Sequence, residues 1–128
     1  MVAWVEYKAA AKARGALALE LYAAISTPAK SPDDVKAALP DHLAYQADLE
    51  RAGRLALAGP MSDESGENMQ GVGLIIYRAP SLEAARALAE ADPMHKTGAR
   101  SFVLRRWMIN EGSLHLSVGL STGGTTLS

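Results

Sequence analysis

The side chains best suited to proton transfer in this sequence are those of His42 and Asp92. An imidazole titrates near ~6.5, so it can accept and return a proton at neutral pH. His42 belongs to a series spaced three and four residues apart, which is typical of the helix face that points to a core. Asp92 lies one step beyond the buried face predicted for a second helix, where an unpaired carboxylate would be costly. The series around His42 consists of Val35, Leu39, His42, Gln46 and Leu49.

We expect the two helices to cover the same sheet face, so that His42 and Asp92 point to one place and form a hydrogen-bonded pair. Asp92 would then orient the imidazole, and His42 would transfer the proton, which contributes typically ~10²–10⁴-fold to a rate. Two plainer interpretations stand beside this one. His42 could be a hydrogen-bonded core histidine without a catalytic role, and Asp92-Pro93 is also ordinary turn chemistry after a helix.

Six further residues are predicted to bind the substrate, namely Gly59, Pro60, Met61, Ser62, Tyr45 and His95. A Gly-Pro turn can bring backbone close to a ligand, or it can simply end a strand. The sequence favours a solvent-facing position for His95, just after a helix, over a role as second proton carrier. His115 is read as a surface or dimer contact.

Trp107 is expected in the core, next to solvated arginines at 105 and 106. The alternative is that these arginines pair with an anionic substrate.

The composition excludes several kinds of site. The 128 residues contain no cysteine, so a thiol nucleophile, a disulfide scaffold and thiolate metal sites are ruled out. The three histidines lack the spacing of a metal site, and none is predicted. Gly71-Val72-Gly73 lacks the third glycine and the following helix of a dinucleotide loop, so we expect no NAD, flavin or other cofactor. Nor does the sequence show a covalent nucleophile.

The charge balance excludes some partners. Thirteen Lys+Arg against fourteen Asp+Glu give no electrostatic case for nucleic acid or a membrane surface. No apolar run approaches the ~20 residues of a membrane-spanning helix. The N-terminus carries charges where a signal peptide would be apolar. We therefore expect a cytoplasmic protein whose partner is a small molecule.

One domain, residues 1–128 with a core at about 16–110, must position these side chains. After residue 15 the periodicity predicts the order strand–helix–strand–strand–helix–strand, which is the ferredoxin-like βαββαβ arrangement of an α+β protein. The sheet face away from the helices also looks apolar, and so small a domain cannot leave it in water. This predicts a homodimer or a higher homo-oligomer. The predicted elements are a short N-terminal helix 3–14, a strand 16–26, a helix 32–52 that Pro40 kinks or restarts, a strand 54–60, a polar loop 61–70, a strand 71–78, a helix 81–91, a strand 100–109, an extra C-terminal strand 113–120 and a frayed tail.

Over residues 17–109 the sequence resembles the YCII-related family. The residues that carry the resemblance are His42-Leu43-Ala44-Tyr45, Leu49, Gly53, Leu57-Ala58-Gly59-Pro60, Gly71-Val72-Gly73, Ser81-Leu82-Glu83-Ala84-Ala85, Ala91-Asp92-Pro93-Met94 and Arg106-Trp107. The segment around Trp4-Val5-Glu6-Tyr7-Lys8 precedes the usual first strand of the family, and the residues after Asn110 extend beyond its usual end.

The resemblance implies a dimeric α+β barrel of ferredoxin-like subunits, with an active site built on His42 and Asp92. It also brings similarity to enzymes of chloroaromatic breakdown, including dehydrochlorination of chlorinated hydroxyquinols. We therefore expect a cofactor-independent enzyme that performs isomerisation, elimination or dehydrochlorination on a small substrate, such as an aromatic molecule, by acid–base chemistry. The alternative is a non-catalytic dimeric module that binds a small ligand and in which the His–Asp pair is structural. A cofactor-free monooxygenase has only fold analogy behind it.

Overall fold

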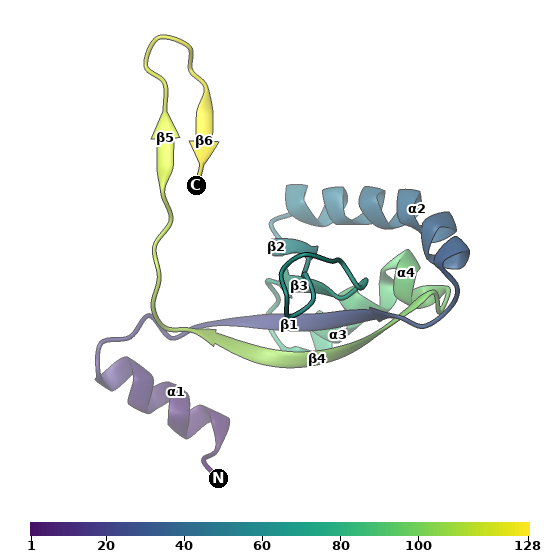
Figure 1. Cartoon of the computed structure of the whole chain (residues 1–128). Coiled ribbons are helices and arrows are strands. Elements are labelled where there is room, and N and C mark those ends of the chain that lie inside the picture. Colours follow the sequence, from purple (N-terminus) through teal and green to yellow (C-terminus); the bar gives the residue numbers. More distant parts are fainter. The chain divides into compact units, whose positions relative to one another are not determined.

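The computed structural model describes residues 1–128, which divide into two compact units. The larger unit comprises Glu20–Trp107, and the smaller one joins Met1–Leu19 to Met108–Ser128. No helix is long and apolar enough to cross a membrane. The elements along the chain are α1 (Trp4–Ala13), β1 (Leu19–Pro28), α2 (Pro32–Arg51), β2 (Leu55–Pro60), β3 (Gly73–Tyr77), α3 (Leu82–Ala91), α4 (Pro93–Lys96), β4 (Arg100–Ile109), β5 (Leu116–Val118) and β6 (Thr125–Leu127) (Figure 1).

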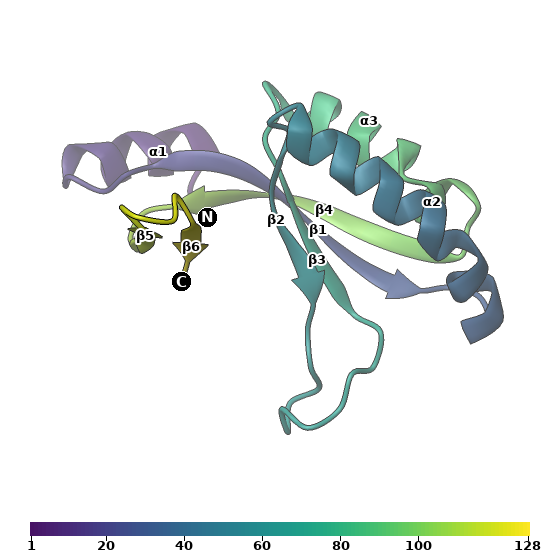
Figure 2. The same cartoon turned by 90° about the horizontal axis from the view of Figure 1, so that it is seen from above.

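The larger unit has the ferredoxin-like fold that the sequence predicts. Its four strands lie in the order β2-β3-β1-β4, and β3 pairs antiparallel with both of its neighbours. The two long helices, α2 and α3, lie side by side on one face of this sheet, as Figure 2 shows. The segment that follows α3 therefore lies beside the first half of α2, where Val35 and Ala38 pack with Met94.

The core lies between the two helices and the sheet. Alternate residues of each strand face it, as the pleat requires, and small residues of α3 let the helix approach the sheet closely. The buried residues are Tyr22 and Ala24 of β1, Leu49 of α2, Ile75 and Tyr77 of β3, Ala85 and Ala89 of α3, and Leu104 of β4.

Serine side chains start both long helices. The hydroxyl oxygens of Ser31 and Ser81 accept hydrogen bonds from the backbone N–H of Asp34 and Ala84, at 3.2 and 3.1 Å. Each serine satisfies one of the N–H groups that a helix leaves free in its first turn. The predicted start of the second helix at residue 81 is thus confirmed.

Several predicted boundaries differ from the structure. Helix α2 continues through Pro40 without restarting, and Leu39 of the predicted stripe is exposed. A further short helix, α4, follows Pro93, because proline is favourable in a first helical turn as well as unfavourable in the previous helix. Strand β1 begins at Leu19 rather than at residue 16.

The extra C-terminal strand is shorter than predicted, and the predicted frayed tail is wrong. Residues 113–120 supply only the three-residue strand β5, and the chain then turns back to form β6, which pairs antiparallel with it. The turn is closed by a hydrogen bond from Gly123 N–H to Gly119 O at 2.8 Å. The leucines that suggested a buried strand face are exposed in this hairpin.

The smaller unit also holds the N-terminal helix, which matches its prediction. The chain leaves α1 through Gly15, whose φ of 90° is favourable only for glycine. A hydrogen bond of 3.0 Å from Leu17 N–H to Asn110 O then joins the two ends of the chain. This contact explains why segments so distant in sequence form one unit.

The sheet face away from α2 and α3 is apolar. Ile25, Leu57, Val103 and Trp107 are all exposed. A groove of about 240 Å³ is lined by Ala23, Ile25, Leu74, Arg105, Arg106 and Trp107.

We expect Ile75→Ala to lower the free energy of unfolding by about 2–4 kcal/mol, because it leaves a cavity between the sheet and the helices. Leu43→Ala is the control, since Leu43 is exposed on α2, and should change the value by less than about 0.5 kcal/mol. Urea titration followed by circular dichroism measures both. Equal losses for the two variants would contradict this placement of the core.

Candidate active site

The structure brings His42 and Asp92 into direct contact. His42 Nδ1 lies 2.8 Å from both carboxylate oxygens of Asp92. His42 projects from the middle of α2, and Asp92 lies at the junction of α3 and α4. The predicted pair therefore exists. It joins α2 to the α3–α4 junction, and its two residues are fifty positions apart in the sequence.

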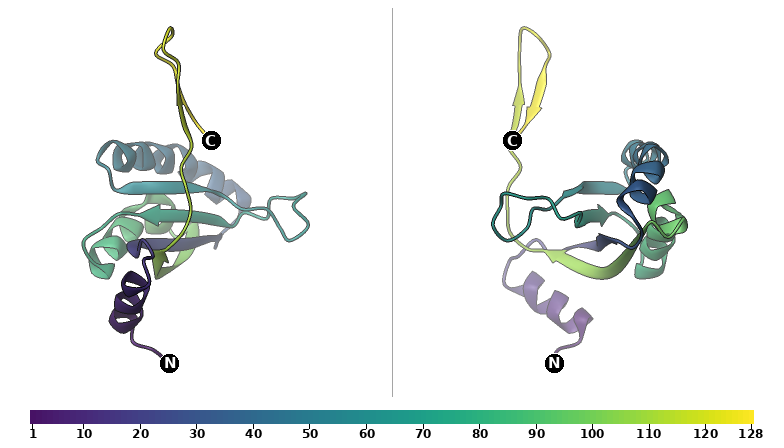
Figure 3. Two further views of the ribbon diagram at one scale, coloured as in Figure 1. Left: turned by 90° about the vertical axis from the view of Figure 1, so that its left-hand side faces the viewer. Right: turned by 45° about the vertical axis from the view of Figure 1, so that its right-hand side comes forward.

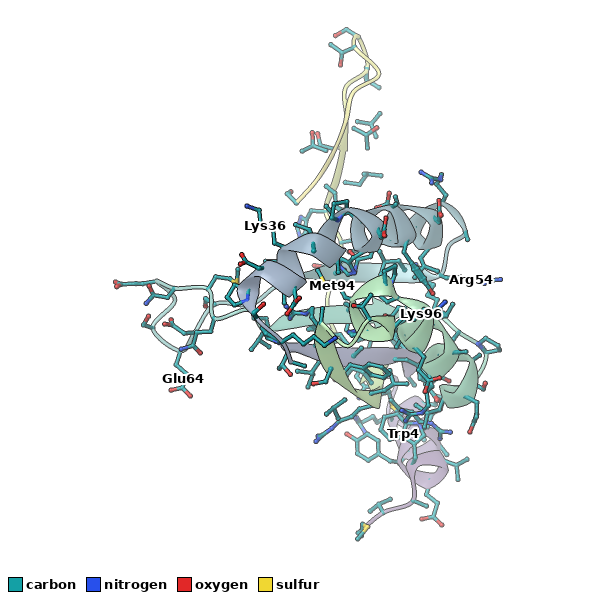
Figure 4. The ribbon with its side chains drawn as sticks, turned by 90° about the vertical axis from the view of Figure 1, so that its right-hand side faces the viewer. Trp4, Lys36, Arg54, Glu64, Met94 and Lys96 are labelled. Atoms are coloured by element: carbon teal, nitrogen blue, oxygen red, sulfur yellow. The ribbon has the colours of Figure 1, made fainter.

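Local structure fixes the carboxylate of Asp92. The residue ends α3 and is also the N-cap of α4, where its Oδ1 accepts a hydrogen bond of 2.9 Å from Met94 N–H. Met94 is buried with Ala38 of α2 and Ala99, which holds this turn against the domain (Figure 4). Asp92 is only 2% exposed, and a buried charge requires polar partners. Met94 N–H and His42 Nδ1 are those partners.

This arrangement assigns the nitrogens of His42. A carboxylate only accepts hydrogen bonds, so Nδ1 carries the proton that is donated to Asp92. Nε2 is then the ring nitrogen that can exchange a proton with another molecule. The side chain of His42 is 15% exposed while that of Asp92 is 3% exposed, so the pair is open on the imidazole side.

Two tyrosines accompany the pair. Tyr45, predicted to line the site, lies one turn after His42 and donates a hydrogen bond of 2.8 Å to Leu88 O. Burial and the nearby charge of Asp92 raise its pKa. Tyr77 is fully buried, and its hydroxyl has no hydrogen-bond partner. Burial and then the charges of Asp92 and Tyr45 raise the pKa of Tyr77 strongly, so both phenols stay neutral near the carboxylate.

His95 is not solvent-facing, contrary to the expectation from its position after a helix. Its Nδ1 lies 2.7 Å from Ala89 O, and its Nε2 lies 2.8 Å from Ser26 Oγ on β1. Phe102 packs against the ring at 4.7 Å between centroids. Burial lowers the pKa of His95, against the opposing effects of the Ala89 carbonyl and Asp92.

The four residues predicted at the end of β2 lie in and after that strand. Gly59 and Pro60 pair with Leu74 and Gly73 of β3, and Met61 N–H continues the ladder to Val72 O at 2.9 Å. Ser62 donates to the neighbouring Asp63 O. The loop that follows projects beyond the sheet (Figure 3). Their role in substrate binding stays a prediction.

One expectation for β4 is wrong. Trp107 is 41% exposed rather than in the core, because it lies on the face away from the helices. Arg106 forms an ion pair of 3.6 Å with Glu20. His115 is exposed, as its reading as a surface residue requires.

No three His, Asp or Glu side chains gather as a metal site would require.

Sequence analysis missed Ser26, Arg100 and Tyr77. The sequence holds one indication of the role of Ser26. Its hydroxyl lies on the face of the strand that otherwise carries Tyr22 and Ala24. Arg100 donates to both the hydroxyl and the carbonyl of Ser26, at 2.9 and 2.7 Å. These contacts join positions 74 residues apart, which no local pattern reveals.

Fold and site together define a class, a small ferredoxin-like α+β domain with a buried carboxylate–imidazole pair between its two long helices. The model of the YCII-related domain family matches residues 20–108, and the chain belongs to this family.

Among solved structures the chain is similar to 5-chloro-2-hydroxyhydroquinone dehydrochlorinase from Burkholderia phenoliruptrix AC1100, solved in complex with 2,5-dihydroxybenzoquinone. The identity is 22% and the TM-score 0.49, over 68% of this chain and 92% of that chain. No curated protein sequence gave a significant match.

Because burial lowers the pKa of His95, acidification should destabilise the fold through this residue. An unfolded histidine binds its proton near pH ~6.5, and the folded one only at lower pH. The unfolded state therefore holds more protons as the pH falls through this window, and the free energy of unfolding decreases. We expect His95→Gln to flatten this slope between about pH 7 and 5. Urea titrations at several pH values measure the free energy of unfolding. His115→Gln is the control, because His115 is exposed. An unchanged slope in His95→Gln would contradict the burial of a neutral imidazole.

Tyr77→Phe and Tyr45→Phe should act in opposite directions. The first removes a buried hydroxyl without a partner and should stabilise the protein by about 1 kcal/mol. The second removes the hydrogen bond to Leu88 O and should destabilise it by about 1 kcal/mol. Urea unfolding compares the two, and a loss of stability in Tyr77→Phe would mean that its hydroxyl is satisfied.

Proposed function

We propose that the protein is a cofactor-independent acid–base enzyme acting on a small molecule, with His42 as the catalytic residue and Asp92 as its orienting partner. The observation that carries this proposal is the contact of 2.8 Å between His42 Nδ1 and the Asp92 carboxylate. The carboxylate fixes the tautomer of the ring and stabilises the imidazolium that forms when Nε2 takes a proton.

The chemistry of the pair suits reactions that move a proton. In an isomerisation His42 Nε2 removes a proton and returns it to another atom of the substrate. In an elimination it removes a proton while the leaving group departs with its bonding electrons, and neither reaction needs an oxidant or a reductant. Dehydrochlorination of a hydroxylated aromatic ring is one such elimination. We propose that the neutral phenol of Tyr45, one turn further along α2, lines the same site.

The rival interpretation is a small-ligand-binding module in which the pair only holds α2 to the α3–α4 junction. The exposure of the imidazole favours the catalytic reading, because a purely structural pair would gain from being sealed.

The test begins with thermal-shift measurements on small aromatic acids, quinols and lactones, including chlorinated hydroxyhydroquinones such as the one named for the structural neighbour. Any ligand that stabilises the protein is then assayed for turnover by chromatography. We expect His42→Ala to lower kcat by about 10²–10⁴-fold, with ligand binding retained. Asp92→Asn, which keeps the capping geometry, should lower it as well. Turnover unaffected by His42→Ala would assign the pair to structure.

We also propose that two copies associate through the sheet face away from the helices. The support is the exposed apolar set Ile25, Leu57, Val103 and Trp107, since monomeric proteins rarely leave large apolar patches in water.

We expect sedimentation at micromolar concentration to give the mass of a dimer or a larger oligomer. Ile25→Glu should lower the observed mass toward that of the monomer, because it places a charge on this face. Leu43→Glu, on the outside of α2, should leave the mass unchanged. A monomeric parent protein would refute the association.

A further inference from the structure

Ser26 occupies an unusual position for a hydroxyl. It lies on the helix-covered side of β1 and is 3% exposed. Three polar groups meet there, because Arg100 Nε donates to Ser26 Oγ at 2.9 Å and His95 Nε2 lies 2.8 Å from the same oxygen. The residues come from β1, β4 and α4, so the fold assembles them from three separate elements.

The hydrogen-bond partners determine where each proton lies. A backbone carbonyl only accepts, so His95 Nδ1 must donate to Ala89 O, 2.7 Å away. Burial lowers the pKa of His95, which keeps the ring neutral at neutral pH and leaves a lone pair on Nε2. Arg100 can only donate, so Ser26 Oγ accepts from it. The hydroxyl proton of Ser26 is therefore directed to His95 Nε2.

This is the arrangement of an activated nucleophile. A hydroxyl hydrogen-bonded to a neutral imidazole, which is itself oriented by a third group, is the pattern of serine-based acyl transfer. Here the orienting group is the carbonyl of Ala89 rather than a carboxylate. The guanidinium of Arg100 adds a positive charge that stabilises negative charge on Oγ.

We propose that Ser26 is a nucleophile for acyl transfer from small activated esters, with His95 as its general base. Ser26 Oγ forms a bond to the ester carbonyl carbon while its proton moves to His95 Nε2. The ester C–O bond then breaks, and the alcohol or phenol leaves with the proton from Nε2. Water, deprotonated by His95 Nε2, attacks the acyl-Ser26 and releases the carboxylic acid, which regenerates the hydroxyl.

The burial of Ser26 sets the size of the acyl group. Because Ser26 is 3% exposed, we expect a short acyl group to reach its Oγ more readily than a long one. The site therefore selects acetyl esters over longer acyl chains. It shares no donor or acceptor atom with the contact between His42 and Asp92, so Ser26→Ala removes this activity and leaves that contact intact.

The experiment uses para-nitrophenyl acetate as the probe. The full chain is mixed with excess ester, quenched in acid, and analysed by intact mass and peptide mapping, while nitrophenolate release is followed by absorbance. We expect one acetyl group on the peptide that contains Ser26 and a release rate higher than for the butyrate ester. Labelling of the parent protein needs no variant and decides the question even if a variant fails to fold.

Matched variants then test the roles. Ser26→Ala should abolish the adduct, and His95→Gln should slow its formation by about 10²-fold or more. Ser101→Ala and His115→Gln are the controls, since Ser101 lies on β4 and only bonds Thr27 at 3.4 Å, and His115 is exposed. Both should label at the parent rate. The absence of acetyl-Ser26 in the parent protein, or equal rates in His95→Gln and parent, would overturn the proposal.

Discussion

The buried negative charge of Asp92 constrains the rest of the structure. A carboxylate that is 2% exposed must have partners, and it finds them in Met94 N–H and His42 Nδ1. The first partner is a backbone N–H group and requires a helix to begin directly after Asp92. The second is a side chain on α2 and requires that helix to lie beside the α3–α4 junction. Because this buried charge must have partners, α3 has to end at Asp92 and α2 has to pack beside that end.

The pair could be predicted from the sequence because both residues continue apolar helical stripes. A polar residue on such a stripe must be buried and must have a partner, and the ferredoxin-like order of elements puts the two stripes over one sheet. The same reasoning placed Ser81 and the boundaries of α2 to within a residue. Hydrophobic periodicity therefore predicts which side chains face the core wherever a helix is long enough to show a stripe.

Other features lay outside the reach of periodicity. Helix α4 has four residues, too few to show a stripe, and Pro93 is compatible with both the end of one helix and the start of another. His95 was misplaced because its partner Ser26 lies 69 residues away on a strand. The alternation of leucines around β5 is typical of a half-buried strand, so the sequence predicts one strand where the chain forms a hairpin. Its exposure depends on what lies beside it, which a local pattern does not contain.

The carbonyl of Ala89 connects the two histidines of the domain. It accepts from His95 Nδ1 and, at 3.3 Å, from Asp92 N–H, so one peptide group supports both Ser26–His95 and His42–Asp92. The α3–α4 turn therefore carries two hydrogen-bond networks on one backbone oxygen. A substitution that displaces this turn would disturb both networks together, even though it touched neither imidazole.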